Sequence, residues 1–169
     1  MNNKIICALT GKNIWQIGNG QSEAYYKNVN IKLSIIEKVS ELIAGGVTDF
    51  LLNAEYGFPL WAAEILISLR DIRIQQGINS FRVYIVMPHE KQAADWNDDI
   101  HERFYNVHEK ADDVLILYKH YRDDCYEKCE RFMIDQCNFL LTDDETAFAT
   151  QYATIHNKPI VICEQLTHV

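Results

Sequence analysis

Three residues that suit phosphate binding follow the first apolar run of the chain. The run Lys4–Leu9 reads KIICAL and is followed by Thr10, Gly11 and Lys12. A glycine just past a buried strand lets the backbone approach a ligand closely, and threonine and lysine side chains are suitable partners for a phosphate. The turn matches neither a G-x-G-x-x-G fingerprint nor a Walker P-loop. We predict that these residues contact a ligand, with an ordinary tight turn as the alternative.

Two carboxylates after the second apolar run are candidates for acid–base chemistry. Glu55 lies in the turn itself, and Glu64 lies on the helix that Pro59 introduces, since proline fits a first helical turn. Glu64 shares a helical face with Leu60 and Ile67, and a buried glutamate is more often functional than an exposed one. We predict Glu55 and Glu64 as weak catalytic candidates, with an amphipathic edge position as the alternative for Glu64.

The third apolar run is followed by a proline and, further on, by a tryptophan. Pro88 and Trp96 could form a wall for a planar base, or Trp96 could simply cover the edge of the sheet. The predicted ligand-binding residues are Thr10, Gly11, Lys12, Asn53, Gly57, Trp61, Pro88, Gln92 and Trp96.

Neither the cysteines nor the acidic runs indicate a metal site. The five cysteines are an odd number, which argues for reduced thiols. Cys125 and Cys129 are spaced to share a helical face, but no C-x-x-C or H-x-x-x-H partner follows them. The acidic run Asp143–Glu145 precedes the last predicted helix, where it suits the helix dipole and could cap the helix. We predict no metal centre.

These residues must be positioned by alternating strands and helices. Near-continuous apolar runs predict strands covered on both faces, as in a parallel sheet. The six predicted strands are Lys4–Leu9, Asp49–Asn53, Arg82–Met87, Asp113–Leu117, Asn138–Thr142 and Pro159–Cys163. The helical periods between them cover Ile31–Ala44, Leu60–Gln75, Ile100–Ala111, Tyr126–Gln136 and Thr146–His156.

This alternation predicts an α/β fold in which a single Rossmann-like domain spans residues 1–169. The sheet is expected to be doubly wound and mainly parallel, with about six strands and helices on both faces. Ligands of such sheets bind at the carboxyl ends of the strands. The candidate residues above therefore belong to loops at one edge of the sheet.

Composition excludes several classes of partner. Sixteen basic and 24 acidic residues give a net charge of −8, which argues against general nucleic-acid binding. No apolar run approaches the roughly 20 residues that span a bilayer. The N-terminal sequence lacks the pattern of a signal peptide, so the expected location is cytoplasmic.

Several segments together resemble the YpsA family of bacterial proteins. The matching features are the Thr10-Gly11 turn, the run Leu60–Glu64 (LWAAE), the spacing of Pro88, Gln92 and Trp96, Ala111-Asp112, and Phe132–Asp135. That family belongs to the SLOG group of Rossmann-like domains, with the DprA and LOG proteins. The resemblance implies a site for a nucleotide or nucleotide-derived ligand, such as one carrying ADP-ribose, and it does not firmly imply any cofactor. The P-G-G-x-G-T motif of the LOG enzymes is absent.

Three hypotheses for the function follow. The first and leading one is a non-catalytic or weakly catalytic domain that binds a small nucleotide-derived ligand. The second is a hydrolase that cleaves an N-glycosidic or phosphoester bond, with Glu64 or Glu55 as the acid or base. The third is an interaction scaffold without a ligand, because nine tyrosines and three tryptophans provide aromatic surface for partners. Assembly into a homo-oligomer is compatible with all three.

Overall fold

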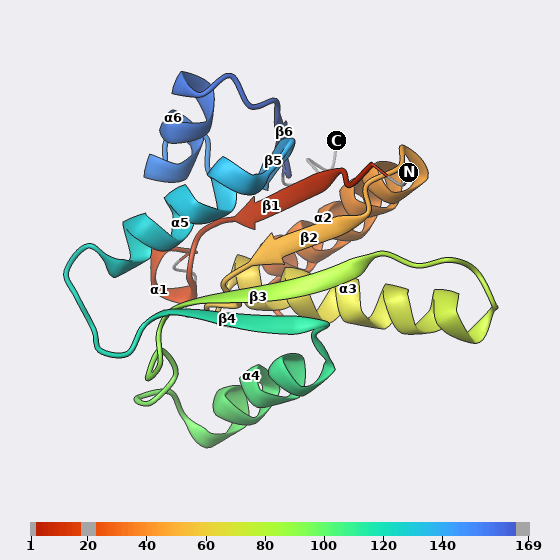
Figure 1. Cartoon of the computed structure of the whole chain (residues 1–169). Coiled ribbons are helices and arrows are strands. Elements are labelled where there is room, and N and C mark those ends of the chain that lie inside the picture. The colour runs from red at the N-terminus through yellow and green to blue at the C-terminus, as the bar shows by residue number, and fades with distance from the viewer. Residues whose placement is uncertain (1–2, 18–22, 165–169) are drawn as a thin grey trace.

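The six apolar runs form one parallel sheet in a computed structural model of the chain, which describes residues 3–17 and 23–164 (Figure 1). The strands are β1 (Ile6–Thr10), β2 (Asp49–Leu52), β3 (Arg82–His89), β4 (Asp113–Tyr118), β5 (Phe139–Thr142) and β6 (Ile160–Ile162). Their order across the sheet is β4-β3-β2-β1-β5-β6, and every neighbouring pair is parallel. The predicted α/β, Rossmann-like class is confirmed.

Helices connect the strands. They are α1 (Ile14–Ile17), α2 (Tyr26–Ala44), α3 (Phe58–Gln75), α4 (Asp98–Lys110), α5 (Cys125–Gln136) and α6 (Phe148–Ile155). Pro59 occupies the first turn of α3, as predicted. The short helix α1 was not predicted, because four residues are too few to show a helical period.

The last helix starts differently from the prediction. The residue that precedes α6 is Ala147, and it makes no side-chain capping bond. The predicted cap by Asp143–Glu145 is therefore wrong. The Asp143 carboxylate instead accepts a hydrogen bond from the backbone of Lys12 (2.9 Å), so the acidic run joins two loops rather than starting a helix.

Helices cover both faces of the sheet (Figure 1). One core cluster joins the sheet to α2, α3 and α4 through buried residues such as Ile35, Leu66 and Phe104. A smaller cluster joins the other face to α5 and α6 through Met133 and Ala153. None of the helices within the described residues has the length and apolar character needed to cross a bilayer.

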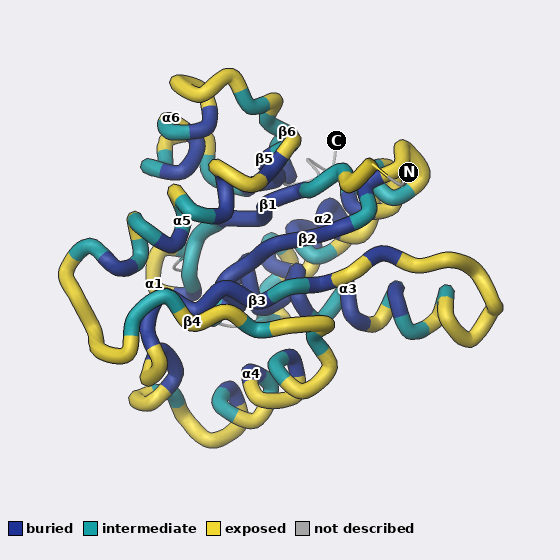
Figure 2. Tube along the Cα trace, viewed as in Figure 1, coloured by how far each residue is buried: buried dark blue, intermediate teal, exposed yellow. Residues whose placement is uncertain are grey.

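The strand β4 departs from the predicted burial on both faces. Most of β4 is exposed or half-buried (Figure 2), and Leu115 and Ile116 are each 45% exposed. The reason is its position at the edge of the sheet, because α5 packs chiefly over β1 and β3 and covers little of β4. An apolar run alone could not distinguish this edge strand from a central one.

Candidate functional site

The order of the strands reverses between β1 and β5. From β1 the chain adds β2, β3 and β4 on one side, and it then returns to add β5 and β6 on the other. Thr10 and Thr142 lie side by side at the carboxyl ends of these two strands. In doubly wound sheets, ligands bind in the crevice outside such a switch point.

A cavity of about 400 Å³ lies at this crevice, and we call it the switch-point cavity. Its lining residues are Lys12, Ile17, Asn28, Ile31, Asp143, Asp144, Glu145, Thr146, Ile162, Cys163 and Glu164. The volume falls within the usual range for small-molecule sites. Of the predicted site residues, the cavity contains Lys12.

The loops after β1 and β5 are joined at the base of this cavity. The backbone N–H of Lys12 donates to Oδ1 of Asp143 (2.9 Å). A Cβ atom on Gly11 would overlap the ring of Phe58 and lie 2.6 Å from the same Asp143 oxygen. Gly11 is therefore required by the packing of protein atoms around it. Thr10 beside it is 4% exposed, and its Oγ1 has no hydrogen-bond partner within the described residues.

The cavity is acidic, with a single cation among the described residues that line it. Lys12 faces a set of carboxylates comprising Asp143, Asp144, Glu145 and Glu164. Burial raises the pKa of Asp143 to about 6, although the hydrogen bond from the Lys12 backbone and the Lys12 charge oppose this shift. Asp144 is held in a turn by the N–H and hydroxyl of Thr146 (3.0 Å each). The cavity can therefore accept hydrogen bonds through its carboxylates and offer one cation among the described residues that line it.

The turns after β1 and β2 are packed directly against each other. The N–H of Phe58 donates to the carbonyl of Lys12 (3.0 Å), and the N–H of Ile14 donates to that of Tyr56 (2.8 Å). Gly57 has a φ of 131°, and a Cβ there would lie 2.6 Å from the Lys12 carbonyl oxygen. The backbone that approaches Gly57 closely is thus the protein's own, in the turn after β1.

Asn53 and Gln92 form a second polar connection behind this turn. Asn53 accepts through its side chain from the N–H of Glu55 (3.0 Å), and its carbonyl accepts from Nε2 of Gln92 (3.1 Å). Both residues are buried, and Oε1 of Gln92 has no hydrogen-bond partner within the described residues. Pro88, which lies on β3 four residues before Gln92, is also buried. The structure therefore places these three predicted residues beneath the carboxyl edge.

Trp61 and Glu64, both on α3, form a network of hydrogen bonds and ion pairs with Arg103 of α4 and with Glu23, which precedes α2. The indole N–H of Trp61 donates to Glu23 (2.5 Å), and Trp61 is 1% exposed, so its ring has no free face for a base. Arg103 binds Glu23 (2.8 Å) and Glu64 (2.5 Å). Burial acts to raise the pKa of Glu23, but the hydrogen bonds from Trp61 and Arg103 outweigh it and lower that pKa. The carboxylate of Glu64 is therefore engaged by a guanidinium.

Glu55 and Trp96 line another cavity, of about 280 Å³, which we call the aromatic cavity. Its lining residues are Asn13, Ile14, Trp15, Glu55, Tyr56, Asp95, Trp96, Asn97 and Ile100. Burial raises the pKa of Glu55 to about 7, with a hydrogen bond from Asn13 opposing the shift. Trp96 contacts Tyr56 (6.5 Å between ring centroids) and Phe104 (5.0 Å). Lys12 and Asn13, neighbours in sequence, thus line two different cavities.

Sequence reasoning missed Glu130 as a half-buried carboxyl group at this edge. Burial raises its pKa to about 7, and the charge of Glu55 adds to the shift. It lies on α5, far in sequence from Glu55, so no local pattern connects the two. The sequence predicts the Asp143–Glu145 run only as a helix cap, because the proximity of this run to Lys12 depends on the β1–β5 pairing.

Comparison with known proteins places these features in a family. The YpsA family model, described as the YspA SLOG family, matches residues 8–159. A UPF0398 protein of Staphylococcus epidermidis is 25% identical over 134 residues, which cover 77% of this chain and 66% of the relative. A UPF0398 protein of Staphylococcus aureus is 24% identical over 119 residues, which cover 68% of this chain and 61% of the relative. The chain thus spans just under two-thirds of the length of these curated relatives.

Proposed function

The chain belongs to the YpsA SLOG family, and on that premise we propose that it binds a nucleotide-derived ligand at the carboxyl edge of its sheet. The observation that carries the proposal is the switch-point cavity, which lies where the strand order reverses between β1 and β5. Its volume of about 400 Å³ suits a small molecule, and its lining combines a lysine with several hydrogen-bond acceptors.

The charges of this cavity favour one kind of nucleotide over another. Lys12 would bind a phosphate, while Asp144, Glu145 and Glu164 would accept hydrogen bonds from sugar hydroxyls. A triphosphate would place several negative charges among these carboxylates with one lysine to offset them, which is unfavourable. A diphosphate flanked by two sugars fits better, because its sugar hydroxyls would donate hydrogen bonds to the carboxylates. We therefore propose an ADP-ribose-like ligand in preference to a nucleoside triphosphate.

Calorimetric titration with ADP-ribose, NAD and ATP tests this proposal. We expect ADP-ribose to bind more tightly than ATP, and Lys12→Ala to weaken ADP-ribose binding about tenfold, the usual effect of losing a hydrogen bond to a charged group. Lys38→Ala is the matched control, since Lys38 pairs with Glu41 on α2, outside the lining of the cavity. No binding of any of these compounds, or equal affinity of wild type and Lys12→Ala at low salt, would contradict the proposal.

A hydrolase is the second candidate function, and one observation favours Glu55 as its acid. Glu55 lines the aromatic cavity and has a pKa raised to about 7 by burial, which suits a group that donates a proton near neutral pH. Glu64 is less suited, because Arg103 holds both of its carboxylate oxygens.

Turnover measurements separate this candidate from simple binding. Wild-type protein would be incubated with ADP-ribose and nucleoside monophosphates, and release of free base or phosphate would be followed. If hydrolysis occurs, we expect Glu55→Gln to abolish it while ligand binding is retained, and Glu64→Gln to keep it. If the wild type binds these compounds without turning them over, the result would support the non-catalytic function and contradict the hydrolase.

A further inference from the structure

The outer edge of β4 is unpaired among the described residues, and the strand itself contains no proline or lysine that would disfavour pairing. β4 pairs with β3 on one side, and Leu115 and Ile116 are each 45% exposed. At the opposite edge, β6 is three residues long and follows Lys158 and Pro159. Short length and proline are features that protect an edge from pairing. β4 spans six residues, DVLILY, with a charge only at its first residue.

Alternate residues of β4 direct their backbone groups away from the sheet. The N–H of Asp112 donates to the carbonyl of Val83 (2.8 Å), and the carbonyl of Tyr118 accepts from Glu90 (3.1 Å). Even-numbered residues of this segment therefore face β3. Because backbone groups of successive strand residues point to opposite sides, the odd-numbered ones face outward. The outward-facing groups belong to Asp113, Leu115 and Leu117.

We propose that the chain forms a two-fold symmetric dimer in which β4 pairs antiparallel with β4 of a second copy. The segment 112–120 reads DDVLILYKH, with acidic residues at its start and basic residues at its end. An antiparallel pairing of this segment with itself brings the opposite charges together, and an isologous interface requires such self-complementarity. The second copy is therefore the partner that the charge pattern of this edge fits.

One register satisfies both the backbone and the charges. Outward-facing residues must lie opposite one another in an antiparallel ladder, so the two-fold axis passes at a residue of the strand. With Ile116 on the axis, Asp113 lies opposite Lys119 of the partner subunit, and Leu115 lies opposite Leu117 of the partner subunit. Opposite charges and apolar pairs facing each other across strands both stabilise a sheet.

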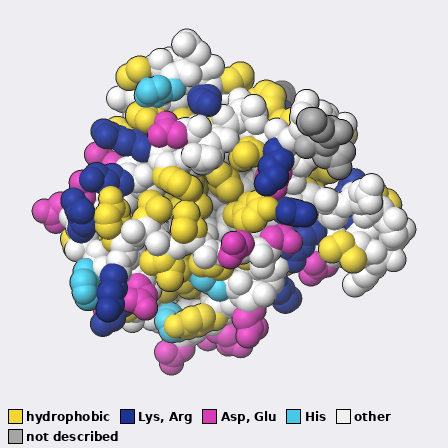
Figure 3. Space-filling view, in the orientation of Figure 1, with side chains coloured by type: hydrophobic (Ala, Val, Ile, Leu, Met, Phe, Trp, Pro, Cys, Tyr) yellow, Lys and Arg dark blue, Asp and Glu magenta, His cyan; other side chains and the backbone are white. Residues whose placement is uncertain are grey.

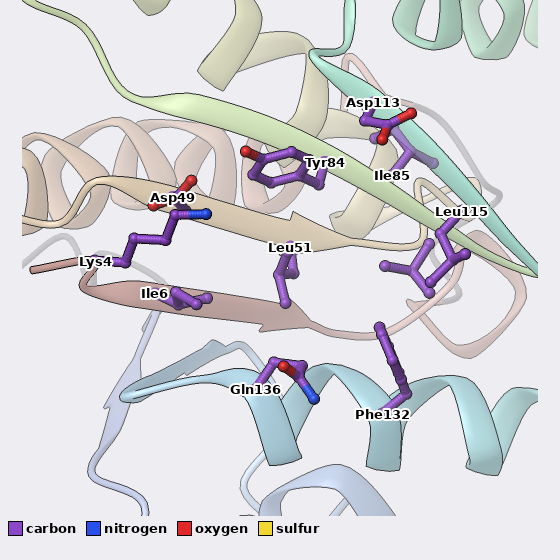
Figure 4. A pocket seen from close by; sticks show the side chains of 11 residues that line it. Lys4, Ile6, Asp49, Leu51, Tyr84, Ile85, Asp113, Leu115, Phe132 and Gln136 are labelled. Carbon is purple, nitrogen blue, oxygen red and sulfur yellow. The ribbon is translucent and has the colours of Figure 1, made fainter.

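The neighbouring surface supports an extension of the sheet in this direction. An apolar groove of about 310 Å³ runs over the strands beside α5, and Asp113 and Leu115 form its border on β4 (Figure 4). Hydrophobic side chains gather at the centre of this face (Figure 3). Pairing at β4 places a second leucine row beside Leu115 and extends the groove across the axis, which removes exposed apolar surface from water.

Sedimentation velocity over a range of protein concentrations tests the dimer. We expect wild-type protein to show a concentration-dependent species of twice the 19.7 kDa chain mass. Lys119→Glu faces Asp113 with a like charge at two symmetric places, so the dimer dissociation constant should rise about tenfold. The double variant Asp113→Lys with Lys119→Asp restores opposite charges and should restore the dimer. Lys38→Glu, which makes the same charge change on α2, should leave it intact.

Amide hydrogen exchange gives a readout that identifies the surface. The N–H groups of Leu115 and Leu117 face solvent in the monomer and would be hydrogen-bonded in the dimer, so their exchange should slow as protein concentration rises. A wild-type protein that stays monomeric near 1 mM (about the concentration of an NMR sample) would overturn the proposal. A dimer in which these amides still exchange rapidly, or which Lys119→Glu and the double variant leave unchanged, would overturn it as well.

Discussion

Two junctions flank the loop that follows β1, and they are built in opposite ways. On the β2 side, the turns are joined by backbone hydrogen bonds, and Gly57 lies against the Lys12 carbonyl with no space between them. On the β5 side, one hydrogen bond from Lys12 to Asp143 joins the loops, and a cavity of about 400 Å³ opens beside it. The same glycine-containing loop is thus packed on one side and accessible on the other.

A glycine or tryptophan that follows a strand can serve either ligand binding or internal packing, and the two junctions show which role applies. Gly57 and Trp61 are typical of ligand sites in sequence, yet here they serve close packing and a buried hydrogen bond. The accessible polar groups come instead from the acidic run after β5, which resembles a solvated helix cap in sequence. Accessibility follows from the reversal of strand order, because loops on either side of that point diverge.

The largest expected effect comes from breaking the packed junction. Gly57→Ala forces a side chain into a φ of 131° and into contact with the Lys12 carbonyl, so we expect the free energy of unfolding to fall by about 3 kcal/mol or more. Gly77→Ala is the matched control, because Gly77 also has a positive φ (72°) but has open space around it. That variant should lose about 1 kcal/mol. Equal losses in urea unfolding would show that the junction is not tightly packed.

Removing Arg103 tests the ion-pair network at α3, the helix that follows the packed junction on the β2 side. Arg103→Met leaves the half-buried carboxylate of Glu64 without its cation and leaves Glu23 with only the longer pair to Lys32 (3.8 Å), so we expect a loss of about 2 kcal/mol, between the values for surface and buried pairs. Because the pKa of Glu23 is lowered in the folded chain, its contribution is present above its unfolded pKa and is lost as pH falls. Urea unfolding at pH 7 and near pH 3 should therefore show the variant's deficit shrinking in acid.

Asp143, at the junction on the β5 side, gives the free energy of unfolding a pH dependence of the opposite sign. Its pKa is raised from 3.8 to about 6 by burial, so the folded chain binds more protons than the unfolded one between these values. The free energy of unfolding should then fall as pH rises from about 4 to about 6. Asp143→Asn removes this contribution, and we expect the decline over that range to shrink by about 2 kcal/mol. An unchanged pH profile in the variant would contradict burial of this carboxyl group.

Lys12→Ala should have the smallest effect on stability. Its backbone makes the junction bonds on both sides, and alanine retains them. We expect a change in unfolding free energy within about 0.5 kcal/mol, as for other substitutions that leave the packing intact. Thermal and urea unfolding measure this directly. A loss as large as that of Arg103→Met would show that the Lys12 side chain is part of the fold rather than free to meet a ligand.

The sequence by itself determined the elements of this protein. The apolar runs identified all six strands, and helical periods terminated by glycine, or introduced by Pro59, identified the longer helices. These signals are local, because a buried strand or an amphipathic helix must carry its apolar residues at fixed spacings. The position of Lys12 at the carboxyl edge followed from the same reasoning, since it comes directly after the first strand.

Only the tertiary structure decided which of those elements meet. Lys12 and Asp143 are 131 residues apart in sequence, and Arg103 lies 80 residues from Glu23 and 39 from Glu64. Strand order determines these meetings, because it places β5 beside β1 and leaves β4 with a free edge. The apolar runs of β2 and β4 are similar in sequence, yet one is fully buried and the other largely exposed. The reason is that burial depends on the neighbours a strand acquires, and parallel neighbours are separated in sequence by whole crossover connections.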